Sequence, residues 1–160
     1  MTTTAAFGWG SSHLNTTPAG EVNLDPPERL AVQQTLARYA FALDHGDLVT
    51  LERVLTEDAT WTASIAGEVE QGPFLGRTAI LDLVREATGA QTEQRRHNLV
   101  NMVFHRADAD TAAVWANLML TSNAGGSATV IATGFYTFTL QHTEGEWRIA
   151  KVFVGLDNAA

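Results

Sequence analysis

The chain contains no cysteine among its 160 residues, which excludes a disulfide framework, a thiolate nucleophile and a metal site with cysteine ligands. Basic residues are few: 10 Lys and Arg stand against 18 Asp and Glu, and the formal net charge is −8 at pH 7. Such an acidic chain is not suited to nucleic acid or to an anionic membrane surface as a partner. No apolar run approaches the ~20 residues that span a membrane, and the N-terminus lacks the basic start and apolar core of a signal peptide. We therefore expect a soluble cytoplasmic protein.

The length of the chain favours a single domain with one sizeable core. Residues 1–25 are rich in Thr, Gly, Ser and Ala and show no hydrophobic periodicity, which is typical of a flexible N-terminal arm. The alternative is an arm in which Phe7 and Trp9 cover a pocket or a neighbouring subunit. Residues 26–160 are expected to form the domain itself.

Helical signals occupy the first part of this domain. Pro26 and Pro27 open a helix at positions where a missing N–H group costs little, and Gly46 is suited to end it. Asp47 is a candidate N-cap for a second helix. The first helix has a wide apolar stripe, made of Leu30, Leu36, Ala37, Ala40, Phe41 and Leu43.

The rest of the chain is predicted to form mainly strands. A first strand is expected over 59–65, a loop with three glycines and a proline over 66–76, and a third helix capped by Thr78. Turn signals separate four later strands, expected over 95–104, 111–121, 128–141 and 146–156. Helices followed by a long antiparallel run predict an α+β domain, with helices on the concave face of a curved sheet. Such an arrangement encloses a cavity of the kind that binds small molecules.

Two chemically capable side chains lie on otherwise apolar elements. Asp44 is near the end of the first helix, on or beside its apolar face; the alternative is an exposed residue that bonds the next turn. His97 lies on an alternating strand with Leu99, Asn101 and Val103 on its face; the alternative is a core histidine that one carbonyl satisfies. A carboxylate beside an imidazole can fix its tautomer, and the imidazole can exchange protons near neutral pH. Asp44 and His97 are therefore candidates for a catalytic pair, and their spacing alone leaves the structural alternative open for each.

Five further residues are candidates for substrate contact. Tyr39 can donate a hydrogen bond into the predicted pocket or anchor its helix, and Trp61 is expected to form a wall. Asn101 shares the predicted face of the catalytic histidine. On the next strand Asn117, a mid-strand amide, needs a partner if it is buried and can orient a carbonyl group. Trp115 shares the face of Asn117, where core packing is the alternative role.

Three segments of the sequence resemble those of a known family. They run from Arg38 to Trp61, from Arg95 to Asn101 and from Gly134 to Val152, and their most specific pieces are FALDHGD, RRHNLVN and GEWRI. Over about residues 28–157 the chain resembles the SnoaL-like domains of the nuclear transport factor 2-like superfamily, and within them the scytalone dehydratase-like group. The resemblance implies a cone-shaped α+β fold, which hosts dehydratases, cyclases, isomerases and noncatalytic subunits.

Residue by residue, the resemblance points to the same pair. Asp44 falls at the helix-end aspartate of scytalone dehydratase and His97 at the histidine of its first long strand, and both serve the syn-elimination of water in that family. A second family histidine would fall near Ala116 or Asn117, where this chain has none. Trp61 stands where that family has a pocket tyrosine. The resemblance therefore implies an acid/base pair without implying dehydration of the same substrate.

The resulting hypothesis is an enzyme that needs no metal or organic cofactor, because no cluster of ligands has metal spacing and no Gly-rich loop leads from a strand into a helix. It would act as a cyclase, dehydratase or isomerase on a hydrophobic, carbonyl-bearing metabolite of polyketide or aromatic type. The alternative is a noncatalytic ligand-binding protein or the small subunit of a ring-hydroxylating oxygenase. We also expect a homodimer formed through the outer face of the sheet, since the strand over 128–141 has Thr and aromatic residues on both faces.

Overall fold

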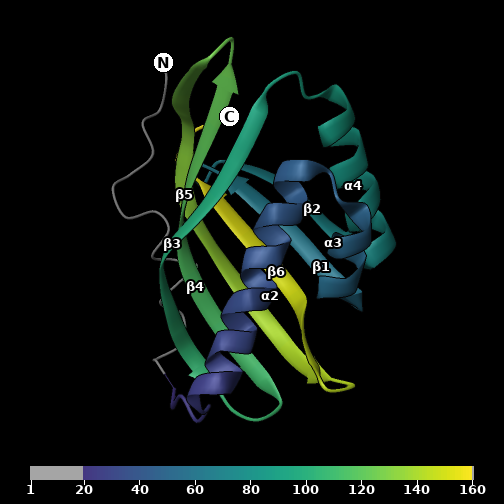
Figure 1. Cartoon of the computed structure of the whole chain (residues 1–160), viewed down its shortest axis with the longest axis vertical. Helices are drawn as coiled ribbons and strands as arrows, with labels where there is room; N and C mark the ends of the chain where they lie inside the picture. The colour runs from purple at the N-terminus through teal and green to yellow at the C-terminus, as the bar shows by residue number, and fades with distance from the viewer. Residues whose placement is uncertain (1–19, 160) are drawn as a thin grey trace.

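A computed structural model describes residues 20–159, and within them three helices cover one face of a mixed sheet (Figure 1). The helices are α2 (Pro26–His45), α3 (Leu48–Val54) and α4 (Arg77–Ala90). The strands are β1 (Leu55–Ile65), β2 (Val69–Leu75), β3 (Gln94–Ala107), β4 (Thr111–Ala124), β5 (Ser127–Thr143) and β6 (Glu146–Leu156). Their order in the sheet is β2-β1-β6-β5-β4-β3; β1 and β6 are parallel, and the other neighbours are antiparallel. The expected α+β class is confirmed. No helix within residues 20–159 has the length and apolar content to cross a membrane.

The first long helix, α2, has a defined cap at each end. Asp25 accepts a hydrogen bond from a first-turn N–H at 3.0 Å, and the two prolines that follow it occupy the first helical positions as expected. At the other end Gly46 has a φ of 61°, a left-handed conformation that glycine adopts without strain. Asp47 then caps α3 by accepting from the Thr50 N–H at 3.0 Å. Because Gly46 ends the helix, Asp44 lies in its last turn.

Helix α2 is apolar around most of its circumference, but only one side of it is buried. Val32 and Tyr39 belong to the hydrophobic core and are almost fully enclosed. Leu30 and Phe41 are 64% and 65% exposed, and Ala37 between them is exposed as well. The predicted stripe was therefore too wide, because sequence spacing does not say which part of an apolar circumference the sheet covers.

The segment over 66–76, expected to be a loop, contains β2 instead. This strand pairs with β1 in antiparallel register, with Trp61 opposite Phe74. Its Gly72-Pro73 pair suggested a loop, but β2 is an edge strand, where a residue without an N–H donor is tolerated. Nearly all of its residues are exposed, so the strand has no alternation of apolar residues by which the sequence could have indicated it.

The first described residues run along β3 instead of standing apart as an arm. The Asn23 N–H donates to the Ala107 carbonyl at 2.7 Å, and Leu24 is buried in the core. Part of the predicted arm therefore packs on the domain. The rest of that arm, residues 1–19 with Phe7 and Trp9, lies outside the described residues.

A bulge in β3 changes which residues share a face with His97. His97 lies opposite Leu120 in β4, but the register shifts between Val100 and Val103. Asn101 at the bulge has a φ of 52°, a left-handed conformation that asparagine adopts more readily than most residues. The extra residue reverses the strand alternation. Asn101 and Val103 are consequently exposed, and the prediction that they share the inward face of His97 is wrong.

The core lies between α2 and the side of the sheet that faces the helices. Tyr136 and Phe138 of β5 pack against Tyr39 of α2, with ring centroids 6.2 and 5.7 Å from it. Leu118 and Leu120 of β4 are buried on the same side. We call this helix-covered side the inner face and the opposite side the outer face.

Candidate active site

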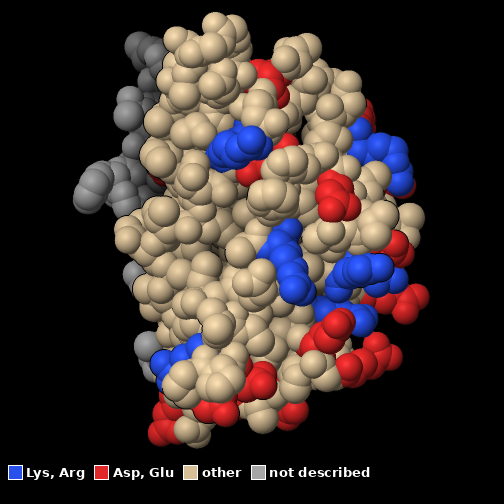
Figure 2. Space-filling view, viewed as in Figure 1, with Lys and Arg blue, Asp and Glu red and all other residues tan. Residues whose placement is uncertain are grey.

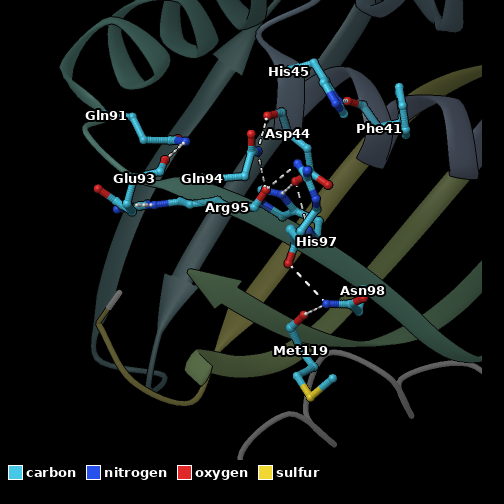
Figure 3. A network of polar contacts seen from close by, with 11 residues as sticks. Phe41, Asp44, His45, Gln91, Glu93, Gln94, Arg95, His97, Asn98 and Met119 are labelled. Carbon is cyan, nitrogen blue, oxygen red and sulfur yellow. Dashed lines mark hydrogen bonds and ion pairs between the residues drawn. The ribbon is translucent and has the colours of Figure 1, made fainter. Parts of the chain in front are cut away.

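Asp44 and His97 are in direct contact, as Figure 3 shows. The Oδ1 atom of Asp44 lies 2.7 Å from the ring Nδ1 of His97 and 2.9 Å from the backbone nitrogen of the same residue. One carboxylate oxygen thus accepts from two groups of a single residue, which fixes the imidazole relative to the strand that carries it. The contact joins the end of α2 to the beginning of β3 and confirms that the fold brings the predicted pair together.

The pair is mostly enclosed. The side chain of Asp44 is 7% exposed and that of His97 is 18% exposed. An ionised carboxylate can only accept hydrogen bonds, so the neutral imidazole carries its proton on Nδ1, toward Asp44. Nε2 is then the basic nitrogen of His97. A proton taken up at Nε2 gives an imidazolium that the adjacent carboxylate stabilises.

Gln94 ties the end of α2 to β3 beside the pair (Figure 3). Its Nε2 donates to the backbone carbonyl of Asp44 at 2.9 Å and to that of Arg95 at 2.8 Å. The Asp44 carbonyl is one of the last in its helix, and such carbonyls lack partners within the helix itself. Arg95 forms an ion pair with Glu93 at 2.6 Å, so its charge is already compensated. These contacts hold the carboxylate in place without placing a cation on it.

A buried set of polar aromatic groups accompanies the pair. Trp61 of β1 donates from Nε1 to the hydroxyl of Tyr39 at 3.2 Å, and Tyr39 also has a hydrogen-bond interaction with Tyr136. Burial raises the pKa of Tyr39 far above its ordinary value. Burial, then Tyr39, then the negative charge of Asp44 raise the pKa of Tyr136. Both phenols are therefore neutral and protonated at physiological pH, and they can act as hydrogen-bond donors.

Tyr136 is the residue of this region that sequence analysis missed. The signal that could have found it is the alternation of β5, in which Tyr136, Phe138 and Leu140 are all buried. Side chains two residues apart on a strand point to the same face. Tyr136 therefore had to lie on the same side of the sheet as the core residues Phe138 and Leu140, beneath α2.

The predicted substrate contacts divide into two groups. Tyr39 and Trp61 lie in the polar aromatic set just described. Asn101 is at the exposed bulge of β3 and does not face the interior. Trp115 and Asn117 alternate with the buried residues of β4 and so lie on the outer face.

The prediction that Trp115 and Asn117 belong to the site is therefore wrong. The ring of Trp115 stacks on His105 with centroids 4.0 Å apart, and Asn117 is exposed. The prediction failed because it assigned the wrong face of β4 to the interior. The inward-pointing neighbours of Trp115 and Asn117 in β4 are Ala116 and Leu118, and the small or apolar side chains of these two residues gave no sign of a polar site.

The arrangement as a whole is suited to moving protons. It offers one basic ring nitrogen, one carboxylate that orients the ring, and neutral phenols close by. Within residues 20–159, no group of three His, Cys, Asp or Glu side chains is placed to hold a metal ion.

The fold and this pair define a class of protein: small α+β domains in which helices cover one face of a mixed sheet and an aspartate at a helix end contacts a strand histidine. The chain belongs to the SnoaL-like domain family, whose model matches residues 27–152. This match confirms the resemblance that the sequence phrases indicated. No curated protein matches the chain at a significant level.

Solved structures show the same fold. The protein Aln2 from a Streptomyces species is 23% identical, with a TM-score of 0.72 over 84% of this chain and 94% of its own. A candidate aromatic ring hydroxylase from Novosphingobium aromaticivorans is 27% identical, with a TM-score of 0.68 over 83% of this chain and 92% of its own. A nuclear transport factor 2-like protein with a cystatin-like fold, from the same organism, is 21% identical, with a TM-score of 0.66 over 84% of each chain. The expected nuclear transport factor 2-like fold is thereby confirmed.

Proposed function

We propose that this protein is an acid/base enzyme of the cyclase, dehydratase or isomerase type, acting on a hydrophobic, carbonyl-bearing metabolite of polyketide or aromatic structure. The observation that carries the proposal is the 2.7 Å contact between Asp44 and His97 in a mostly enclosed setting. Burying ionisable groups is costly even when they are paired. A pair kept there despite that cost is suited to a chemical role, and proton transfer is the chemistry that a carboxylate and an imidazole perform together.

In this proposal His97 moves the proton and Asp44 assists it. Nε2 of His97 removes a proton from the carbon next to the substrate carbonyl. Asp44 holds the ring in the required tautomer and stabilises the imidazolium that forms. Its Oδ1 already accepts two hydrogen bonds from His97, which favours this orienting role over direct attack on the substrate by the carboxylate.

The neutral phenols supply the other half of the chemistry. Removal of the proton places negative charge on the substrate oxygen, and donors aimed at that oxygen stabilise the enolate. Tyr39 and Tyr136 are the proposed source of such donors. The imidazolium then returns its proton to a different carbon in an isomerisation, to a departing hydroxyl in a dehydration, or to the alkoxide formed when the enolate attacks a second carbonyl in a cyclisation. None of these steps requires a cofactor.

A mass-spectrometric screen of polycyclic ketones and their hydroxylated forms tests the proposal. We expect the wild type to convert at least one compound, and Asp44→Asn and His97→Ala to lower kcat/KM by roughly 10²-fold or more, the usual scale for a general acid or base. The double variant should be little worse than either single one, because groups that act as a unit are not additive. His45→Ala is the matched control, since His45 is an exposed histidine at the same helix end. Normal turnover by both variants, with a lower melting temperature, would assign the pair to structure.

The second candidate is a noncatalytic role, as a ligand-binding protein or as the small subunit of a ring-hydroxylating oxygenase. The reason to consider it is that the similar structures include one named as the β subunit of a candidate aromatic-ring-hydroxylating dioxygenase, beside the 27%-identical one named as a candidate aromatic ring hydroxylase. Under this role no compound of the screen is converted, and a large oxygenase subunit co-expressed with the chain co-purifies with it in a fixed ratio. For either role we propose a cytoplasmic homodimer that binds neither nucleic acid nor membranes, consistent with its net charge of −8.

A further inference from the structure

The polar aromatic set beside the pair has one more donor hydrogen than its own contacts use. One N–H or O–H hydrogen is present on each of Trp61, Tyr39 and Tyr136. Trp61 Nε1 donates to the Tyr39 hydroxyl at 3.2 Å, and Tyr39 and Tyr136 share a hydrogen bond. These two contacts use two hydrogens. Within residues 20–159 neither hydroxyl has a further hydrogen-bond partner, so one phenolic hydrogen has no acceptor there.

This surplus hydrogen is enclosed by the fold. Tyr39 is 1% exposed and Tyr136 is 3% exposed, and their rings meet edge to face with centroids 6.2 Å apart. Buried hydroxyl groups nearly always have a hydrogen-bond partner, because an unpaired buried donor lowers stability. A donor that is kept despite this cost is suited to an oxygen atom that another molecule brings into the site.

The hydrogen bonds of the set run in one direction, from Trp61 toward Tyr136. An indole N–H can only donate, so the Tyr39 oxygen accepts from Trp61. A hydroxyl that accepts one hydrogen bond becomes a better donor in the next, which favours donation from Tyr39 to Tyr136. The hydrogen that remains is then that of Tyr136. The charge of Asp44 agrees with this order, since it contributes to the raised pKa of Tyr136 and not to that of Tyr39.

No basic side chain replaces this donor. Among the described residues, no Lys or Arg contributes to the pKa shift of either phenol. The Lys and Arg side chains that Figure 2 shows lie at the surface, in part over α2 and α3. Apart from the imidazolium of His97 that the proposed mechanism forms, negative charge on a substrate oxygen inside the fold is therefore stabilised by neutral hydrogen-bond donors.

We infer that Tyr136 is a catalytic residue that donates its hydroxyl hydrogen to the substrate oxygen, and that Tyr39 and Trp61 are positioning residues that orient and polarise it. The inference rests on the proposed function, because that function supplies the enolate oxygen. It narrows the proposed donors from two phenols to one. It also names a ligand class: a compound whose oxygen carries negative charge binds more tightly than a compound of the same shape without that oxygen.

Equilibrium dialysis of the full chain with para-nitrophenol tests the inference, because its phenolate resembles an enolate and absorbs visible light. The control ligand is para-nitrotoluene, which has a methyl group in place of the hydroxyl. We expect the wild type to bind para-nitrophenol more tightly and to hold it as the phenolate. Tyr136→Phe should raise the Kd of para-nitrophenol by roughly tenfold or more, the scale of one hydrogen bond to a charged group, and leave the Kd of para-nitrotoluene unchanged.

Variants of the other aromatic residues separate the donor from the positioning residues. Tyr39→Phe and Trp61→Phe keep the Tyr136 hydroxyl but remove the bonds that polarise it, so each should raise the Kd of para-nitrophenol by only roughly two- to threefold. Trp147→Phe is the matched control, because it removes an indole N–H that Glu28 accepts at 2.6 Å outside the set. It should change neither Kd. Circular dichroism checks that each variant is folded.

NMR of the wild type provides a measurement in the unaltered protein. The chain has two tyrosines, so isotope labelling of the ring carbon that bears the hydroxyl gives two signals, which either phenylalanine variant assigns. We expect para-nitrophenol to shift the signal of Tyr136 more than that of Tyr39.

Two results would overturn the inference. In the first, Tyr39→Phe weakens the binding of para-nitrophenol as much as Tyr136→Phe does, or the Tyr39 signal shifts more, which would make Tyr39 the terminal donor. In the second, the wild type binds para-nitrophenol no more tightly than para-nitrotoluene, which would assign the hydroxyl to structure.

A failure of the proposed function gives a different pattern. Phenolate binding then depends on Tyr136, but no ketone of the mass-spectrometric screen is converted. Conversion that depends on Asp44 and His97 and not on Tyr136 would refute this inference alone.

Discussion

Replacing Asp44 by alanine removes the acceptor of two hydrogen bonds at once. Oδ1 accepts from the backbone N–H of His97 at 2.9 Å and from its ring Nδ1 at 2.7 Å. The carboxylate is only 7% exposed, so water replaces it poorly. A hydrogen bond to a charged group contributes about 1.5–3 kcal/mol, and a buried donor left unpaired costs about 1–3 kcal/mol. Because both bonds share one oxygen and one partner residue, we expect a combined loss of about 3 kcal/mol in the free energy of unfolding, and not the sum of two separate bonds.

Asp44→Asn is the comparison that separates the acceptor from its charge. The amide keeps an oxygen near the position of Oδ1 and removes a charge whose burial is unfavourable, so we expect a loss of about 1 kcal/mol or less. The assay is urea and thermal unfolding followed by circular dichroism. In a domain of this size 1 kcal/mol shifts Tm by about 2–4 °C, so the alanine variant should melt about 6–12 °C below the wild type. Asp58→Ala, at an exposed position, should change the stability by no more than about 0.5 kcal/mol.

Equal stability of Asp44→Ala and Asp58→Ala would refute this account, because the contact would then contribute nothing measurable. Equal destabilisation of Asp44→Asn and Asp44→Ala would also refute it, since the charge and not the acceptor would then be what matters. A double-mutant cycle with His97→Ala measures the pair directly, and its coupling energy should be about 1–2 kcal/mol. A coupling near zero would mean that the two side chains do not interact in solution.

The buried phenols, the bulge and the outer face each lead to a further prediction. Tyr39 and Tyr136 are the only tyrosines of the chain, and burial raises the pKa of both. The folded state therefore binds their protons more tightly than the unfolded state does. As a result, the stability of the fold falls once the pH rises past the ordinary tyrosine pKa of about 10. Ultraviolet titration should show no phenolate until circular dichroism shows unfolding, and phenolate formed near pH 10 in a folded protein would contradict this. Asn101, at a φ of 52°, should accept glycine with no loss of thermal stability, whereas Asn101→Val should lower stability by about 1–2 kcal/mol; equal melting temperatures would speak against the bulge. The proposed homodimer should scatter light as a particle of twice 17.3 kDa at micromolar concentration, and a mass of 17.3 kDa would rule it out.

Both ends of α2, the start of α3 and the last strand were determined by the sequence itself, whereas the predicted cap at Thr78 is wrong, because α4 begins at Arg77 and its N-cap is Gly76. Pro26, Gly46 and Asp47 each occupy the position predicted for them, and β6 has the predicted bounds Glu146–Leu156. These signals are local, because a cap or a turn is satisfied by atoms only a few residues away. The pair Asp44 and His97 was also identified in advance, since each is a polar residue on an apolar element within a phrase that resembles the SnoaL-like family.

Only the tertiary structure decided which faces are inside. The bulge at Asn101 reverses the alternation of β3, and a single such residue exchanges the two faces of a strand. The position of α2 across the sheet decides which residues of β4 face inward. These are Ala116 and Leu118, and not Trp115 and Asn117. The same packing buries Tyr136 beside Tyr39 and leaves Phe41 in solvent. Apolar periodicity indicates that one side of a segment is buried. Which of two apolar sides is buried depends on contacts with residues far away in the chain. The sequence of a single segment does not contain those contacts.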